Sequence, residues 1–205
     1  MNETKKNLPT GAAPLFLNMF LTVIFNIIFK GHYAYIKAAR PTTQAMKKMN
    51  KKNLTCIEIG TSSGLNALSI LRELHIKKLY LIDPYMPYMQ DGKVWQDSKF
   101  SEKVAKTILM SYNKKIQFIK MKSEDAVKLF ADNSIDFVYI DGNHDYKFAK
   151  KDIELYYSKV KKGGIIGGHD FSANYFGVIK AVLSFVRKHD LKLYTLVDDW
   201  WIVKR

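Results

Sequence analysis

The chain has 205 residues, of which 47% are hydrophobic and 25% are charged, the balance of an ordinary globular protein. This length is enough for one domain with a substantial hydrophobic core and is too short for two domains that each have such a core. The single cysteine, Cys56, excludes an internal disulfide bond and lies within an apolar run. We therefore interpret Cys56 as a core residue and expect a reducing, cytoplasmic setting.

The formal net charge of +14 would attract anionic partners such as nucleic acid, phosphorylated glycans or acidic lipid. Most of it comes from lysine, since the arginines are only Arg40, Arg72, Arg187 and Arg205. Many lysines form doublets spread along the chain: Lys47-Lys48, Lys51-Lys52, Lys77-Lys78, Lys114-Lys115, Lys150-Lys151 and Lys161-Lys162. Because specific phosphate recognition favours the planar guanidinium group, we interpret the lysines as a solvated surface and do not expect a nucleic-acid partner.

The chain begins with a loose leader, residues 1–14, followed by an almost entirely apolar stretch, Leu15–Phe29. Its polar residues Asn18, Thr22 and Asn26 recur every four positions, which predicts a helix with one narrow polar stripe. A spanning helix needs about 20 apolar residues, so this stretch is too short to cross a bilayer comfortably. Three interpretations stay open: a helix that packs on the domain or on a second subunit of a homodimer, a peripheral membrane attachment, or a targeting segment.

Strands and helices are expected to alternate regularly only from residue 54. We therefore divide the chain into residues 1–53, which contain the leader and helices, and a domain of residues 54–205. In the first part, Gly31–Lys52 predicts a more polar helical stretch that is broken at Arg40-Pro41. The strands expected in the second part are Leu54–Ile59, Leu79–Ile82, Ile116–Met121, Ile135–Ile140, Gly163–Gly168, Leu191–Val197 and Trp200–Lys204. The helices expected there are Gly64–Leu74, Ser98–Tyr112, Ser123–Phe130 with a serine cap, Tyr146–Val160 and Gly177–Lys188.

Strand–helix alternation at this spacing is typical of parallel βαβ units with helices on both faces of a sheet. The last two β-like runs are separated by Asp198-Asp199 and predict a closing hairpin that adds an antiparallel edge strand. The sequence therefore predicts a doubly wound, Rossmann-like α/β fold. Its sheet is mostly parallel and seven-stranded, with a C-terminal antiparallel hairpin and an N-terminal helical extension.

Polar residues follow the predicted strands, and ligands of open α/β sheets bind beyond the carboxyl ends of the strands. The first strand leads into Glu58-Ile59-Gly60-Thr61-Ser62-Ser63-Gly64-Leu65-Asn66. Its glycines allow a tight turn and a close approach to a ligand, and the next helix start offers N–H groups. The second strand is followed by Asp83, a carboxylate able to accept two hydrogen bonds from ribose hydroxyls. Ser123, Glu124 and Asp125 follow the third strand, where an adenine edge would be read.

A nicotinamide dehydrogenase is the first competing class for such a loop. It would carry a Gly-x-Gly-x-x-Gly motif, but here Thr61, Ser62 and Ser63 fill the middle. Tyr146 and Lys150 have the spacing of a dehydrogenase catalytic pair, yet they follow the fourth strand on a charged helix. We interpret that pair as a coincidence.

Four motifs resemble those of class I S-adenosylmethionine-dependent methyltransferases. They are Ile57-Glu58-Ile59-Gly60-Thr61-Ser62-Ser63-Gly64, Leu81-Ile82-Asp83-Pro84, Val138-Tyr139-Ile140-Asp141-Gly142-Asn143-His144-Asp145-Tyr146 and Gly163-Gly164-Ile165-Ile166-Gly167-Gly168-His169-Asp170. More narrowly, the chain is similar to small O-methyltransferase-like proteins that include macrolide-sugar methyltransferases and cephalosporin hydroxylase-associated proteins. The resemblance covers about residues 54–205, and the motif around Asp141 is its most specific part.

The resemblance implies S-adenosylmethionine as the cofactor and gives the strand-end residues expected roles. The methionine part would be lined by Glu58, Gly60 and Asn66, with Asn66 near the carboxylate; Asp83 would bind the ribose, and Ser123 with Glu124 would flank the adenine. Thr61, Ser62, Gly64 and Asp141 complete the expected cofactor-binding set. The expected catalytic residues are Asp141 and His144, with His144 as general base, because an unperturbed histidine titrates near pH 6.5.

In metal-dependent relatives, Asp141 and the residues at positions 169 and 170 hold a magnesium ion that chelates the substrate oxygens. Here position 169 is histidine, so the candidate ligands of a divalent metal are Asp141, His169 and Asp170. Two carboxylates and an imidazole suit zinc, manganese or iron better than magnesium. In the alternative interpretation, His169 caps the strand and Asp170 orients His144.

The segment Tyr85–Trp95 is a long loop that carries aromatic residues and methionines and lies beside the expected methyl group. Such a loop predicts a lid or a binding loop, and a tucked surface loop is the alternative.

The expected function is transfer of a methyl group to a hydroxyl of a small molecule such as a sugar. Two alternatives stay open. One is a non-catalytic nucleoside-binding module that acts in interactions or at a membrane surface, and the other is an RNA methyltransferase, favoured only by charge.

Overall fold

A computed structural model describes residues 39–90, 92–95 and 99–205. The predicted helix Leu15–Phe29, its interpretation as a dimer or membrane contact, and the beginning of the Gly31–Lys52 stretch lie outside the described residues. Among the helices that the structure describes, none is both long and apolar enough to cross a membrane.

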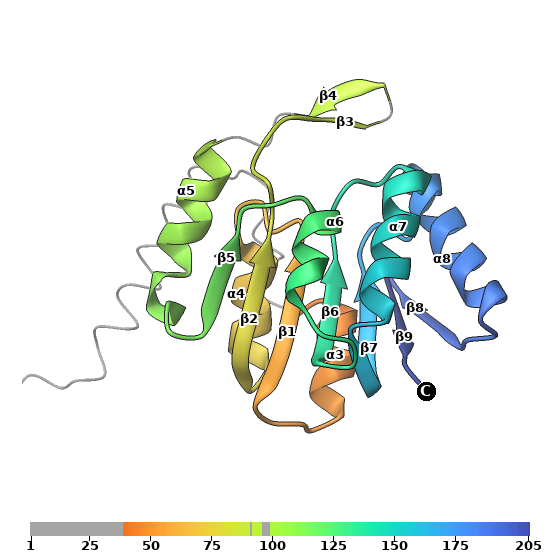
Figure 1. The fold of residues 1–205 in the computed structure, drawn as a ribbon, viewed down its shortest axis with the longest axis horizontal. Coiled ribbons are helices and arrows are strands. Elements are labelled where there is room, and N and C mark those ends of the chain that lie inside the picture. Colours follow the sequence, from red (N-terminus) through yellow and green to blue (C-terminus); the bar gives the residue numbers. More distant parts are fainter. Residues whose placement is uncertain (1–38, 91, 96–98) are drawn as a thin grey trace, which may run out of the picture. The chain divides into compact units, whose positions relative to one another are not determined.

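Seven strands form one sheet in the order β5-β2-β1-β6-β7-β9-β8 (Figure 1). Their bounds are β1 (Leu54–Ile59), β2 (Ile76–Ile82), β5 (Ile116–Ile119), β6 (Ile135–Ile140), β7 (Val160–Gly168), β8 (Leu193–Leu196) and β9 (Asp199–Val203). Strands β5, β2, β1, β6 and β7 pair in parallel in this order, and β9 pairs antiparallel with both β7 and β8. The predicted doubly wound, mostly parallel seven-stranded sheet is confirmed. The reversed strand of the hairpin, β9, lies inside the sheet, and β8 forms the edge.

Helices cover both faces of this sheet. Their bounds are α3 (Pro41–Lys48), α4 (Leu65–Glu73), α5 (Lys99–Ile108), α6 (Ser123–Ala126), α7 (Tyr146–Tyr157) and α8 (Phe176–Lys188), with short 3₁₀ turns at η1 (Met110–Tyr112), η2 (Val127–Leu129) and η3 (Ala173–Tyr175). In Figure 1, α6 and α7 lie in front of the sheet and α4 lies behind it. Each long helix buries one stripe, as α8 does with Val178, Ala181, Val182 and Phe185.

Helix α3 joins the same compact unit as the sheet. The Thr42 backbone N–H donates to Asp199 Oδ2 at 3.0 Å, and the Thr42 hydroxyl donates to the Trp200 carbonyl at 3.3 Å. The Asp199 carboxylate at the start of β9 therefore satisfies an N–H group in the first turn of α3 that has no partner within the helix.

Four local predictions need correction. Strand β2 begins at Ile76 because the exposed Lys77 and half-buried Lys78 are tolerated where a strand enters the sheet, and β7 likewise begins at Val160. Ser123 does not cap α6; its hydroxyl donates instead to Asp152 of α7. The predicted loop Tyr85–Trp95 contains an antiparallel hairpin, formed by β3 (Tyr88–Gln90) and β4 (Lys93–Trp95).

The pairing of β7 with β9 predicts a strict size limit at Gly167. A Cβ atom there would lie 2.3 Å from the Trp200 carbonyl oxygen and 2.8 Å from Trp201 Cβ. We expect Gly167→Ala to lower the free energy of unfolding by about 1–3 kcal/mol, as overpacking usually does. Urea unfolding followed by circular dichroism measures this loss. Gly142→Ala is the control, because its added Cβ would meet nothing closer than 3.5 Å, and equal losses in both variants would contradict the prediction.

Candidate active site

The loop after β1 is shaped by two glycines with positive φ. Gly60 has φ +82°, and a Cβ atom there would lie 1.9 Å from the carbonyl oxygen of Asp141, so no side chain fits. Gly64 has φ +79° and begins α4 without a side-chain cap. The loop therefore contacts the end of β6 directly, and no side chain caps the first turn of α4.

A buried acid lies beneath this loop. Glu58 is only 1% exposed, and Asn66 Nδ2 donates to its Oε1 at 2.9 Å. Burial raises the pKa of Glu58 to about 8, although the hydrogen bond from Asn66 opposes the rise. The Oδ1 atom of Asn66 is buried and has no hydrogen-bond partner in the described chain. A buried carboxyl group and a buried carbonyl oxygen are thus available to a ligand that donates hydrogen bonds or carries positive charge.

Asp83, directly after β2, connects the first two loops. Its Oδ2 accepts the backbone N–H of Ser62 at 2.8 Å, and its Oδ1 accepts that of Tyr85 at 2.8 Å. The Tyr85 hydroxyl donates back to the Ser62 carbonyl at 3.0 Å. The two backbone hydrogen bonds fix the Asp83 carboxylate directly after β2, and its role toward ribose hydroxyls stays a prediction.

Two histidines and two aspartates meet where β6 and β7 end. His144 Nε2 lies 2.7 Å from Asp170 Oδ2 and 4.0 Å from Asp141 Oδ1, while His169 Nδ1 lies 2.9 Å from Asp170 Oδ1. The Tyr175 ring covers His144, with the ring centroids 4.4 Å apart. Asp170 has φ +61°, a conformation that is strained for a residue with a side chain and is found in many functional sites.

These contacts set the charge of His144. Burial opposes its protonation, but Asp141 and Asp170 outweigh that effect and raise the pKa of His144 to about 9. The two histidines in turn hold the pKa of Asp170 below its usual range, against the effect of burial. His144 is therefore an imidazolium at neutral pH, whereas the general-base role predicted from the sequence assumed an unperturbed histidine.

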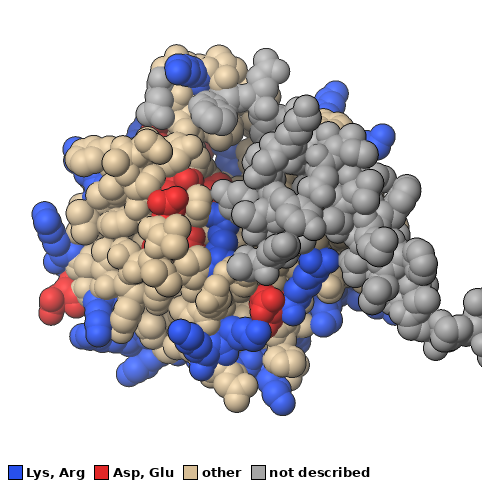
Figure 2. All heavy atoms as spheres, turned by 180° about the vertical axis from the view of Figure 1, so that it is seen from behind, with Lys and Arg blue, Asp and Glu red and all other residues tan. Residues whose placement is uncertain are grey.

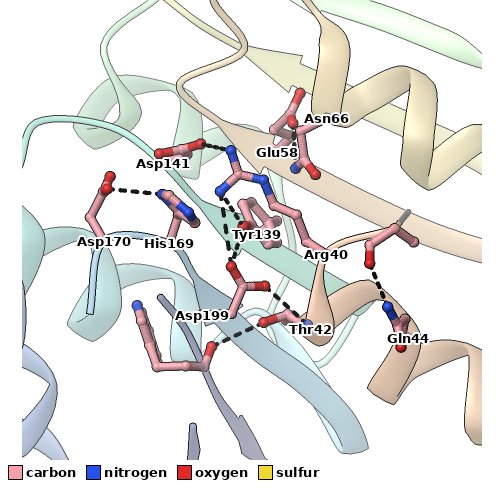
Figure 3. A network of polar contacts seen from close by, with 12 residues as sticks. Arg40, Thr42, Gln44, Glu58, Asn66, Tyr139, Asp141, His169, Asp170 and Asp199 are labelled. Atoms are coloured by element: carbon pink, nitrogen blue, oxygen red, sulfur yellow. Dashed lines mark hydrogen bonds and ion pairs between the residues drawn. The ribbon is translucent and has the colours of Figure 1, made fainter. Parts of the chain in front are cut away.

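Arg40, just before α3, is the main site residue that the sequence analysis missed. Its Nη1 donates to the Tyr139 hydroxyl at 3.1 Å, and its Nη2 lies 3.5 Å from Asp141 Oδ2 (Figure 3). The same guanidinium lies 3.9 Å from Asp199 Oδ1. Asp141 is thus held between Arg40 and His144. The signal in the sequence was an arginine, rare in this lysine-rich chain, directly before the Pro41 that begins a helix.

Gln90 in the β3–β4 hairpin is a second residue that was not predicted. The backbone N–H of His144 donates to Gln90 Oε1 at 3.2 Å, and Asn143 Nδ2 donates to the Met89 carbonyl at 2.8 Å. These two hydrogen bonds attach the hairpin to the loop that carries His144. The predicted role of this segment as a lid or a binding loop stays a prediction. The hairpin itself could not have been predicted, because each of its strands has only three residues, too few for a period-2 pattern.

The predicted adenine-binding residues lie at the end of β5 and bond to α7. The Ser123 hydroxyl donates to Asp152, the Tyr156 hydroxyl donates to the Ser123 carbonyl at 2.8 Å, and Glu124 pairs with Lys151. None of the hydrogen bonds or ion pairs of the described chain joins Ser123 or Glu124 to the histidine cluster. Their assignment to the adenine stays a prediction.

At the histidine cluster, one set of three side chains places its ligand atoms close enough together to bind a divalent metal. Ligand atoms of Asp141, His144 and Asp170 all lie within 4.8 Å of one another. The sequence had named His169 instead of His144, and His169 is hydrogen-bonded to Asp170. The set suits a transition metal better than magnesium, and binding requires His144 to be neutral.

The sheet order with one reversed strand, the glycine loop and the strand-end cluster define a Rossmann-like α/β protein of the methyltransferase type. The chain belongs to the family described as methyltransferase domain, which matches residues 57–171.

One curated relative and two solved structures are similar to the chain. The chain is 33% identical over 126 residues to uncharacterized protein R132 of Acanthamoeba polyphaga mimivirus, a match that covers 59% of this chain and 53% of that protein. The chain thus spans about half the length of this curated relative. It is similar to the SAH-bound methyltransferase PaMTH1 of Podospora anserina, with a TM-score of 0.64, 10% identity and 98% and 100% of the two chains covered. The O-methyltransferase from Bacillus cereus in complex with SAH gives a TM-score of 0.60, with 14% identity and 92% and 91% covered. At these identities the two structures show the fold alone.

The raised pKa of His144 predicts a pH-dependent stability. Because the folded pKa, about 9, exceeds the usual unfolded value of about 6.5, the stabilisation is fully present below pH 6.5 and is lost as the pH rises through 9. We expect this loss to reach at most about 3 kcal/mol. Urea unfolding at several pH values from 6 to 10 measures it.

The matched variants for this measurement are His144→Gln and His75→Gln, the second being an exposed histidine outside the cluster. His144→Gln should flatten the decline of stability between pH 6.5 and 9, and His75→Gln should keep it. The same slope in wild type and in His144→Gln would show that the cluster does not hold the proton.

Proposed function

We propose that this protein is an S-adenosylmethionine-dependent O-methyltransferase that acts on a hydroxyl group of a small molecule such as a sugar. The observation that carries the proposal is the convergence of the Gly60 loop, Asp83 and the His144 cluster at one edge of the sheet. Family membership supports the methyltransferase activity. The two neighbours solved with SAH (S-adenosylhomocysteine) support the cofactor.

The polar groups around the glycine loop suit the two ends of this cofactor. Asp83 would accept the ribose hydroxyls, and the backbone from Gly60 through Thr61 and Ser62 to Gly64 would lie along the methionine part. Asn66 was expected near the methionine carboxylate, but its Nδ2 already donates to Glu58. The remaining oxygen of Asn66 and the Glu58 carboxyl group therefore suit the ammonium group better.

When bound, S-adenosylmethionine supplies a sulfonium methyl group that an oxygen nucleophile takes in an in-line displacement. The chain must hold the acceptor, remove its proton and exclude water. Asp170 Oδ2 lies 2.7 Å from Nε2 of His144, so Nδ1 is the atom that we assign to the acceptor proton. Asp141, held by Arg40, adds negative charge that stabilises the resulting imidazolium.

A divalent metal at Asp141, His144 and Asp170 is the alternative use of the same cluster. Such an ion would polarise the acceptor hydroxyl and lower its pKa. The two uses exclude each other, because a histidine that binds the metal cannot accept the proton at the same time. We propose the base, because Asp141 and Asp170 flank His144 and would stabilise the imidazolium that forms when it takes the acceptor proton. Loss of activity on addition of a chelator, restored by manganese or zinc, would instead favour the metal.

The base assignment predicts an alkaline pH profile. With an acceptor found by screening hydroxyl compounds against methyl-labelled cofactor, kcat/KM should rise with pH to a midpoint near 9. Asp170→Asn removes a contact that raises the pKa of His144, so its midpoint should move to lower pH. His144→Gln should lower kcat by roughly 100-fold or more while SAH affinity is kept. Wild-type turnover in His144→Gln would remove the assignment.

The Glu58 assignment predicts pH-dependent cofactor binding. Because Glu58 must lose its proton to pair with an ammonium group, SAH affinity should rise with pH until about pH 8, by up to about tenfold per unit. Methylthioadenosine, which lacks the amino-acid part, is the matched control ligand and should bind with little change over the same range. Isothermal titration calorimetry of wild type and Glu58→Gln with both ligands measures this. An equal pH dependence for the two ligands would place the ammonium group elsewhere.

A further inference from the structure

Lysine doublets that look scattered in the sequence gather at one edge of the sheet, opposite the candidate active site. Doublets lie at the amino ends of four of the five parallel strands: Lys51-Lys52 before β1, Lys77-Lys78 in β2, Lys114-Lys115 before β5 and Lys161-Lys162 in β7. Lys47-Lys48 ends α3 close by. Parallel strands begin at the same edge, so the topology brings these doublets together. We call this set of five doublets the amino-edge lysines.

Direct contacts agree with this gathering. Lys51 Nζ donates to the Gly163 carbonyl of β7 at 2.7 Å, and Lys78 Nζ donates to the Ile116 carbonyl of β5 at 3.0 Å. Seen from behind, Lys and Arg atoms line the lower edge of the molecule, which is the edge where the strands begin (Figure 2).

Few acids neutralise the amino-edge lysines. Lys47 pairs with Glu73 and Lys161 with Asp136. The exposed Lys48, Lys52, Lys77, Lys114, Lys115 and Lys162 make no ion pair within the described chain. Elsewhere, Lys106 pairs with Glu102 and Lys128 with Asp125, while the exposed helix residues Lys99, Lys103 and Lys147 make no ion pair within the described chain. The amino-edge lysines therefore carry positive charge that only Glu73 and Asp136 offset by an ion pair within the described chain.

We propose that the amino-edge lysines form a docking face for an anionic lipid membrane surface. Lysine is a compact point charge that is attracted by the diffuse negative potential of acidic headgroups and needs no fixed geometry. Each lysine near such a surface adds a similar increment of binding, so a face of doublets suits a membrane better than one bound phosphate group. The sequence also carries the apolar stretch Leu15–Phe29, and stable attachment to a membrane takes two such signals.

Docking through this face would leave the other edge of the sheet accessible. The glycine loop and the His144 cluster lie at the carboxyl ends of the strands, so they would point away from the membrane. Membrane binding and methyl transfer would then be separable properties of the chain, and vesicle binding can be measured whether or not the proposed enzymatic function is correct.

The test is sedimentation of the full chain with phosphatidylcholine vesicles, with and without 30 mol% (roughly a third) phosphatidylglycerol. One variant reverses three exposed amino-edge lysines, K52E/K114E/K115E. The matched control reverses three exposed lysines on the helices, K99E/K103E/K147E, with the same change in net charge. Circular dichroism shows that each variant is folded.

We expect the wild type to bind only the vesicles that contain phosphatidylglycerol, less tightly at high salt, and the amino-edge variant to bind at least about tenfold more weakly. The control variant should bind within about threefold of wild type. Equal losses in the two variants would mean that net charge alone acts and would overturn the proposal. So would an absence of vesicle binding, or displacement from the vesicles by RNA at equal phosphate concentration.

Discussion

The contact between Gly60 and the carbonyl of Asp141 is the constraint on which the site depends. Strands β1 and β6 are neighbours in the sheet, and the turn after β1 passes so close to the end of β6 that only a glycine fits. This contact brings the loop proposed for the cofactor against the segment that carries Asp141 and His144. The arrangement of the site therefore follows from backbone packing at two adjacent strand ends, and side chains then give the site its chemistry.

Arg40 and Asp199 connect the first and last elements of the domain, α3 and β9, with Asp141 at the end of β6. Asp199 at the start of β9 binds α3 through Thr42 and accepts the Tyr139 hydroxyl, and Arg40 joins Asp199 to Asp141. Burial opposes the charged form of Asp199 and raises its pKa, so the nearby guanidinium is needed to hold that carboxylate. The segment before the first strand is thus part of the site, and the charge of Asp141 is balanced from two sides by Arg40 and His144.

The sequence predicted what depends on local patterns. Apolar runs followed by Gly60, Asp83, Asp141 and Asp170 located the strands and their carboxyl ends, and Asp198-Asp199 located the final turn. Arg40 and Gln90 were missed because their roles come from contacts between segments 50 or more positions apart, which no periodicity encodes. The pKa of His144 was missed for the same reason, and the lysine doublets looked dispersed because only the strand order brings them to one edge.

A crystal structure of the full chain with SAH tests most directly whether the cofactor lies at the carboxyl ends of β1, β2 and β6. We expect the ribose hydroxyls to donate to Asp83 and the amino group to lie at Glu58 and Asn66. The sulfur atom should face the gap between the Gly60 loop and His144. SAH bound away from the carboxyl ends of β1, β2 and β6, or excluded by the side chains that fill this region, would contradict it.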